Sequence, residues 1–120
     1  MTSAERPLPH WLTVSTGPAA VFDGRACRTR AAFFDEAVRV LDLPGYFGRN
    51  WDALTDSLRD VTRPLIVEHA EHLLSAEPPG QFATLLAVLS DASTDGLTVT
   101  LCTDPAHEAA LRTRITAALR

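Results

Sequence analysis

Residues 43–58 read LPGYFGRNWDALTDSL, an aromatic and glycine turn that leads directly into a short amphipathic segment. Asn50 is a good N-cap, because its side-chain oxygen can accept one of the unpaired backbone N–H groups of a first helical turn. From there the apolar residues recur at helical spacing and form one stripe of Trp51, Leu54, Leu58 and Val61. The stretch therefore predicts a helix from about Trp51 to Asp60.

The outer face of this predicted helix is acidic. Asp52, Asp56 and Asp60 fall one above the other, opposite the apolar stripe. Like charges at this spacing repel each other by a few tenths of a kcal/mol per pair, although Arg59 on the same face softens the repulsion. Such a run is most often a solvated face. The alternative is a surface that meets a positively charged partner.

The bulk composition indicates one domain, since 120 residues with 46% apolar content suffice for a core. A net charge of −4 argues against nucleic acid or anionic membrane as a direct ligand and suits a basic protein partner. The sequence contains no apolar run of membrane-spanning length and no signal-peptide order at its N-terminus, so we expect a cytoplasmic protein. Cys27 and Cys102 are too far apart for a local metal or disulfide motif and predict small core residues.

The rest of the chain predicts alternating strands and helices. Strands are expected at 19–22, 65–67 and 97–102, with a possible short one at 11–15. Helices are expected after the caps Thr29 and Asp104 and from about 81 to 93. Helical crossovers between strands imply a mostly parallel sheet covered by helices. The continuous apolar run at 65–67 is typical of a strand buried on both faces.

Signals for catalysis are weak. The sequence has no Gly-rich phosphate loop and no Gly-x-Ser-x-Gly elbow. The segment Glu68-His-Ala-Glu-His72 resembles a set of metal ligands, but no further ligand is identifiable within reach, so a polar loop is favoured. Neither cysteine has a histidine nearby in sequence, and buried thiols are unreactive. We therefore expect no enzyme, no metal and no cofactor.

The turn before the acidic helix offers candidate contact residues. Gly48 lies between bulky neighbours just before the N-cap, which indicates a left-handed backbone, a close approach of a partner or a tight turn. Of the two adjacent aromatic residues, Tyr46 is the better surface anchor, because its hydroxyl can bond while its ring packs. Phe47 is then the better core residue.

With these residues assembled, the segment 44–58 resembles the centre of the barstar family of intracellular ribonuclease inhibitors. The similarity extends back through Val21-Phe-Asp-Gly24 and forward through 64–68 and 95–101. It implies an α/β fold with a three-stranded parallel sheet packed by helices. We expect a barstar-like domain at 19–104, an extra leader or strand at 1–18, and a C-terminal helix at 105–120 packed on the same domain.

The resemblance also implies a function. In this family the second helix and the loop before it enter a ribonuclease active site, where an aspartate takes the place of an RNA phosphate. That position is Asp56 here. The other contacts implied by the resemblance are Tyr46, Phe47, Gly48, Asn50, Asp52 and Asp91. The expected partner is a basic, extracellular-type ribonuclease or a related toxin, bound by a monomer acting as an antitoxin or immunity protein.

Several positions depart from the family pattern and rearrange the contact area. Phe47 lacks a hydroxyl that the family carries, Thr55 stands in place of a tryptophan, and Trp51 in place of a leucine. Arg49 adds a positive charge to the contact loop. Arg49 and Thr55 favour the alternative, a protein-protein interaction module without inhibitory function, because a fold does not fix a function.

Overall fold

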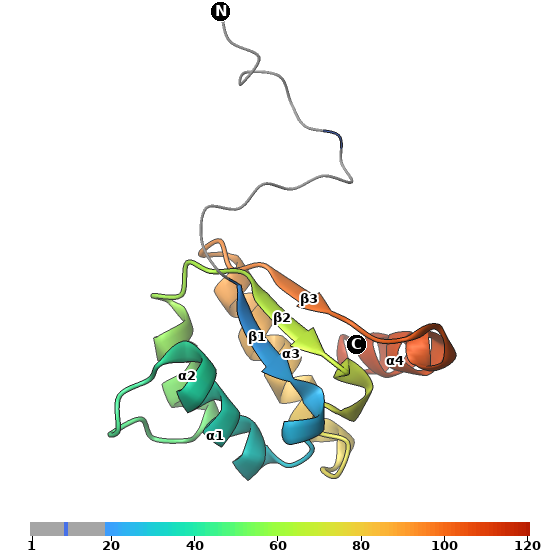
Figure 1. The fold of residues 1–120 in the computed structure, drawn as a ribbon, viewed down its shortest axis with the longest axis horizontal. Helices are drawn as coiled ribbons and strands as arrows, with labels where there is room; N and C mark the ends of the chain where they lie inside the picture. The colour runs from blue at the N-terminus through green and yellow to red at the C-terminus, as the bar shows by residue number, and fades with distance from the viewer. Residues whose placement is uncertain (1–8, 10–18) are drawn as a thin grey trace, which may run out of the picture.

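The computed structural model describes residue 9 and residues 19–120, and the order of elements within them is the predicted one (Figure 1). The strands are β1 Ala20–Asp23, β2 Leu65–Glu68 and β3 Val99–Leu101. The helices are α1 Arg30–Leu41, α2 Trp51–Leu58, α3 Pro79–Ser93 and α4 Pro105–Ala118, with short 3-10 turns η2 Gly24–Ala26 and η3 Ala70–His72. The possible strand at 11–15 lies outside the described residues.

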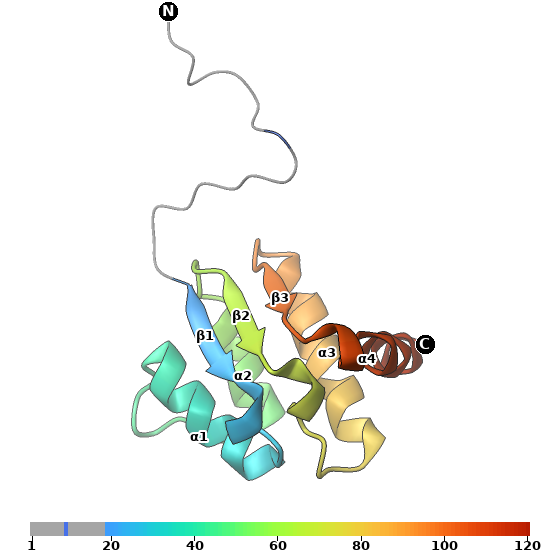
Figure 2. The same cartoon turned by 45° about the vertical axis from the view of Figure 1, so that its right-hand side comes forward.

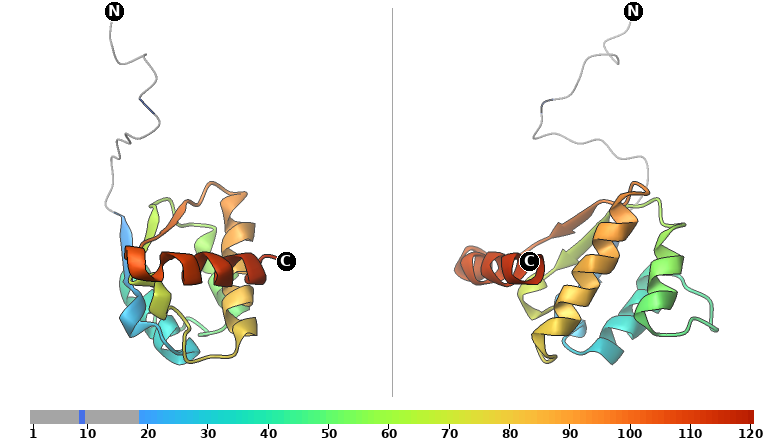
Figure 3. Two further views of the ribbon diagram at one scale, coloured as in Figure 1. Left: turned by 90° about the vertical axis from the view of Figure 1, so that its right-hand side faces the viewer. Right: turned by 180° about the vertical axis from the view of Figure 1, so that it is seen from behind.

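The three strands form one parallel sheet, as predicted, and their order in it is β1-β2-β3. Ala20 is paired with Leu65, and Leu65 with Val99. The chain between β1 and β2 contains α1 and α2, and the chain between β2 and β3 contains α3. The helices α1, α2 and α3 all lie behind the sheet in Figure 1 and in front of it in the view from behind (Figure 3). The last helix, α4, lies on the β3 side, where it contacts α3 and η3 (Figure 2).

Within residues 19–120, helices cover one face of the sheet. Phe22, Leu65 and Val67 point into the core and are buried. On the other face, at one level of the register, Ile66 is half-buried and Val21 is 41% exposed. The expectation of a strand at 65–67 buried on both faces is therefore wrong for Ile66. The physical reason is that α1, α2 and α3 gather on a single side.

The predicted helix starts are confirmed at three caps. The hydroxyl oxygen of Thr29 accepts a hydrogen bond from the Ala32 N–H at 3.1 Å, and the Asp104 carboxylate accepts one from the His107 N–H at 3.0 Å. Asn50 caps α2 in the same way, accepting from the Ala53 N–H at 2.8 Å. Each cap is a local interaction, which explains why residue type alone located these starts.

The end of α2 differs from the prediction of a helix to Asp60. The helix ends at Leu58, because the following N–H groups bond to the third preceding carbonyl: Asp60 to Ser57 at 3.4 Å and Val61 to Leu58 at 3.1 Å. Such bonds tighten the chain into a turn. Asp60 therefore lies beyond the helix, while Val61 still packs against the core.

The two cysteines lie in different surroundings. Cys27 is fully buried, and its burial, together with the nearby Glu36 and Asp23 carboxylates, raises the pKa of its thiol to about 12. Cys102 is exposed, so the prediction of a core residue is wrong there. The strand β3 ends at Leu101, and Cys102 directly follows the C-terminal end of this strand.

Glu36 is a buried carboxylate that the sequence did not single out. Its Oε2 accepts the Asp23 N–H at 3.1 Å, which ties α1 to the end of β1. Arg39 binds both oxygens in a fork, at 3.0 and 2.8 Å. This hydrogen bonding holds the pKa of Glu36 below its ordinary value.

None of the helices in the described part of the chain is long and apolar enough to cross a membrane.

Candidate functional site

The loop before α2 is held in shape by Asn50. Its side-chain Nδ2 donates to the Gly48 carbonyl at 3.1 Å, while its Oδ1 caps the helix through Ala53. A further bond from the Phe47 N–H to the Pro44 carbonyl, at 2.9 Å, closes the turn. One residue therefore fixes both the loop and the helix that follows.

Gly48 is needed for space. Among the described glycines only Gly96 has a left-handed backbone, so the prediction of a positive φ at Gly48 is wrong. The left-handed residue is its neighbour Arg49, with a φ of 48°. A Cβ on Gly48 would lie 2.9 Å from Asn50 Nδ2, closer than real Cβ contacts allow. The hydrogen-bonded turn ends just before Gly48, and the glycine leaves room for the cap side chain; the close approach of a partner at this position stays a prediction.

The positive charge of Arg49 is matched within the protein. Its Nε lies 3.1 Å from an Asp35 oxygen on α1, and both side chains are exposed. An exposed pair of this kind contributes little to stability. It does direct the guanidinium toward α1, so the charge that Arg49 adds to the loop has an exposed carboxylate beside it.

The two loop aromatics divide as expected between surface and core. Tyr46 is 89% exposed, whereas Phe47 is only 7% exposed. The Phe47 ring lies 6.1 Å from that of Phe34, measured between centroids. Tyr46 is therefore free to contact a partner, and Phe47 anchors the loop from beneath.

Trp51 joins α2 to its neighbours. The Trp51 ring is half-buried, with its centroid 4.9 Å from that of Phe34, and its Nε1 donates to Gln81 Oε1 on α3 at 3.1 Å. The Thr55 hydroxyl donates to the Trp51 carbonyl at 2.9 Å, a hydrogen bond within α2. Trp51 therefore sets the position of the helix, and the polar group of Thr55 is satisfied inside it.

The acidic ridge, defined as Asp52, Asp56 and Asp60, is exposed throughout. Asp52 lies in the first turn of α2, where the helix dipole favours an acid. Asp56 lies in the last turn, where the dipole opposes one. An acid at the wrong end of a short helix does not serve the stability of that helix.

Asp56 projects outward and is only loosely paired. Its carboxylate is 75% exposed, and its one ion pair in the described structure is with Arg59, at 3.6 Å. That arginine is itself 64% exposed. Because exposed pairs of this length contribute only about 0–1 kcal/mol, Arg59 does not hold Asp56 against a stronger cationic partner.

A shallow groove runs beside the acidic ridge. Tyr46, Asp56 and Asp60 border it together, although they come from the loop, the helix and the turn after it. The remaining lining residues are Leu41, Leu43, Pro44, Ser57, Val61, Thr62 and Arg63. Sequence patterns did not predict this groove, because its walls come from three separate segments. Asp91 is exposed on α3 and is not among the lining residues.

Comparison with known proteins adds one family. The model of the family described as Barstar (barnase inhibitor) matches residues 18–110. The matched range includes all three strands, the helices α1 to α3, and the first part of α4. No curated protein matches the chain.

Proposed function

The chain belongs to the barstar family, and from this we propose that it inhibits a ribonuclease or a related toxin by blocking its active site with α2 and the loop before it. The observation that carries the proposal is the outward, loosely paired carboxylate of Asp56. We propose no catalytic role, because the family is described as an inhibitor.

The chemistry of a carboxylate suits this role. Its two oxygens can accept a bidentate fork from arginine, much as a phosphate does. A ribonuclease must hold phosphate with cationic groups, so an aspartate presented on a rigid helix competes for the same groups. Asp56 is such a residue, since Trp51 fixes α2 against α3 through Gln81.

The proposed contact surface consists of exposed residues on one side of α2. Tyr46 and the carboxylates of Asp52 and Asp56 form its centre, and Asp91 is a further acidic contact on α3. Phe47 supports the loop from beneath, and Asn50, which is itself exposed, holds its shape. The groove beside the ridge gives a partner side chain a place to insert between Tyr46 and Asp60.

The experiment follows RNA cleavage by basic, barnase-type ribonucleases mixed with the protein. We expect inhibition of a cognate enzyme, and Asp56→Ala should weaken the complex by about 2–5 kcal/mol, because it leaves buried cationic groups of the enzyme unpaired. The matched control is Asp95→Ala, which removes the same charge from the exposed turn after α3. Equal inhibition by the two variants would contradict the proposal.

The alternative is an interaction module without inhibitory function, which Arg49 and Thr55 favoured. For Arg49, the exposed carboxylate of Asp35 lies beside the added charge. A pull-down separates the two functions: the inhibitor captures a basic nuclease, and the module captures a protein of another class. We propose that the protein acts as a monomer in the cytoplasm, and size-exclusion chromatography with light scattering measures the first of these points.

A further inference from the structure

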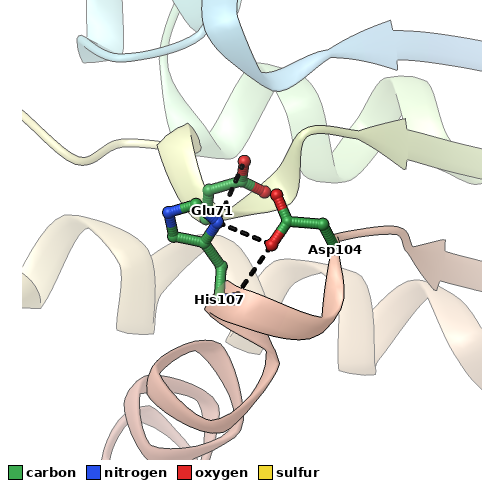
Figure 4. Close-up of side chains that lie close together, drawn as sticks. All are labelled: Glu71, Asp104 and His107. Atoms are coloured by element: carbon green, nitrogen blue, oxygen red, sulfur yellow. Dashed lines mark hydrogen bonds and ion pairs between the residues drawn. The ribbon is translucent and has the colours of Figure 1, made fainter.

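Three metal-ligating side chains meet on the side of the molecule where α4 begins. They are Glu71 in η3, Asp104 at the N-cap of α4 and His107 in its first turn (Figure 4). One ligand atom from each lies within 4.8 Å of those of the other two. The sequence pattern had singled out the segment that contains Glu71, but Asp104 and His107 are too far along the chain to be recognised as its partners.

The donor atoms of the cluster lie close enough together to be compared with the ligands of a small cation. His107 Nδ1 lies 2.7 Å from Asp104 Oδ1, which is a hydrogen-bond distance, and 4.0 Å from Glu71 Oε2. Around a tetrahedral Zn²⁺, with bonds of about 2.0–2.2 Å, neighbouring donors stand about 3.3 Å apart. A bound ion would take the place of the shared proton between His107 and Asp104, and the donors would have to move to reach that spacing.

The carboxylate of Glu71 is oriented by a neighbouring hydroxyl. The Thr103 hydroxyl donates to Glu71 Oε1 at 2.7 Å, which leaves Oε2 directed at His107. A second imidazole, that of His72, lies with its Nε2 3.7 Å from Glu71 Oε2.

We propose that Glu71, Asp104 and His107 form a binding site for a divalent transition-metal ion, with zinc as the best fit and water in the fourth position. Mixed imidazole and carboxylate ligands select zinc, cobalt or nickel over calcium or magnesium. Glu71 and His107 line a pocket that Arg114 also borders. The Arg114 guanidinium lies over the Phe82 ring, 3.9 Å from its centroid. This inference is independent of the proposed ribonuclease inhibition.

A metal at this position would join α4 to η3. The helix α4 has one buried apolar residue, Leu111, and half-buried Ile115 and Ala118. An ion bound across the two elements stabilises the docked helix, because the site does not exist when the helix is detached. Binding therefore has a readout in thermal stability as well as in direct titration.

The experiment titrates Zn²⁺ alone into the full chain by calorimetry and follows the thermal unfolding midpoint. We expect one ion per chain and a higher Tm. His107→Asn and Glu71→Gln should each bind about tenfold more weakly or worse. The control is His69→Asn, an exposed histidine outside the cluster, whose left-handed φ of 51° asparagine also adopts. It should bind as the unmodified chain does.

Two results would overturn the site: no binding by the unmodified chain, or equal affinities for the unmodified chain and both cluster variants. Circular dichroism of each variant shows whether it is folded before the affinities are compared. Co²⁺ supplies a second measurement, because its visible absorption reports nitrogen and oxygen ligands in tetrahedral geometry. A spectrum that stays that of the hydrated ion counts against the proposal.

Discussion

The carboxylates of Glu36 and Asp56 differ in burial and in hydrogen bonding. Glu36 is buried and held by Arg39 and the Asp23 N–H. Asp56 is 75% exposed and has only the loose contact with Arg59. A buried acid with complete hydrogen bonding fixes the fold, whereas an exposed acid at the unfavourable end of a helix is available to a partner.

Glu36→Gln should destabilise the protein by about 1–3 kcal/mol, because it replaces a charged acceptor of three hydrogen bonds. The pKa of Glu36 is lowered in the folded state, so its stabilisation is complete above its ordinary value of 4.5. It is lost as the pH falls through the depressed folded value. Urea unfolding at a series of pH values should show a shallower acid loss in the variant than in the unmodified chain.

Glu108→Gln is the control for this prediction, because it alters an exposed pair with Arg112 on α4. We expect its free energy of unfolding to stay within about 0.5 kcal/mol of the unmodified chain. A Glu36→Gln variant that loses no more than this control would show that the buried fork is not a stabilising contact.

The two cysteines should differ sharply toward thiol reagents. Burial raises the pKa of Cys27 to about 12, so its thiolate is scarce, while Cys102 is exposed. A chromogenic disulfide reagent should therefore modify Cys102 quickly in the native protein and Cys27 only after denaturant is added. Cys102→Ser should abolish the fast phase. Fast modification of Cys27 in the folded chain would contradict this assignment.

At the scale of the element, α2 depends on its surroundings. Eight residues are too few for a stable isolated helix. Its start is fixed by the Asn50 cap, and Trp51 joins it to α1 through the Phe34 ring and to α3 through Gln81. The acidic ridge is therefore held in place before any partner arrives, which lowers the entropy cost of binding.

Asn50→Ala should cost about 1 kcal/mol of stability through loss of the cap. It should also weaken ribonuclease inhibition, since the variant loses the bond that fixes the loop through Gly48. The comparison is Thr29→Ala, which removes the equivalent cap of α1. Chemical unfolding and inhibition are measured for both. Matched losses of inhibition in the two variants would show that the effect of Asn50 is only one of stability.

The sequence predicted what is local and missed what is assembled from distant segments. The caps Thr29, Asn50 and Asp104 and the order of strands and helices follow from short patterns, and the structure confirms them. The pairing of Arg49 with Asp35 and the groove beside Asp60 bring together separate segments of the chain. The periodic spacing of residues within one helix or strand does not predict such contacts. One-sided coverage of the sheet likewise depends on how the three helices of its two crossovers pack, which the composition of a strand does not indicate.

At the scale of the molecule, the net charge of −4 bears on how fast a basic enzyme is captured. Raising ionic strength from about 0.05 to 0.5 M shortens the Debye length severalfold and should slow association about tenfold or more. Dissociation should change much less, because contacts at close range are screened weakly. Stopped-flow mixing measures both rates. An association rate independent of salt would argue against electrostatic steering by the acidic ridge.

The wholly parallel sheet bears on how the chain reaches its native state. Among the described residues no strand has a hairpin partner: Ala20 pairs with Leu65, and Leu65 with Val99. Closing such loops costs entropy before any ladder forms, so the folding rate is limited by distant pairings instead of local ones. During synthesis, β1 can pair with β2 only after residues 65–68 have left the ribosome, and β3 can join only after residues 99–101 have followed.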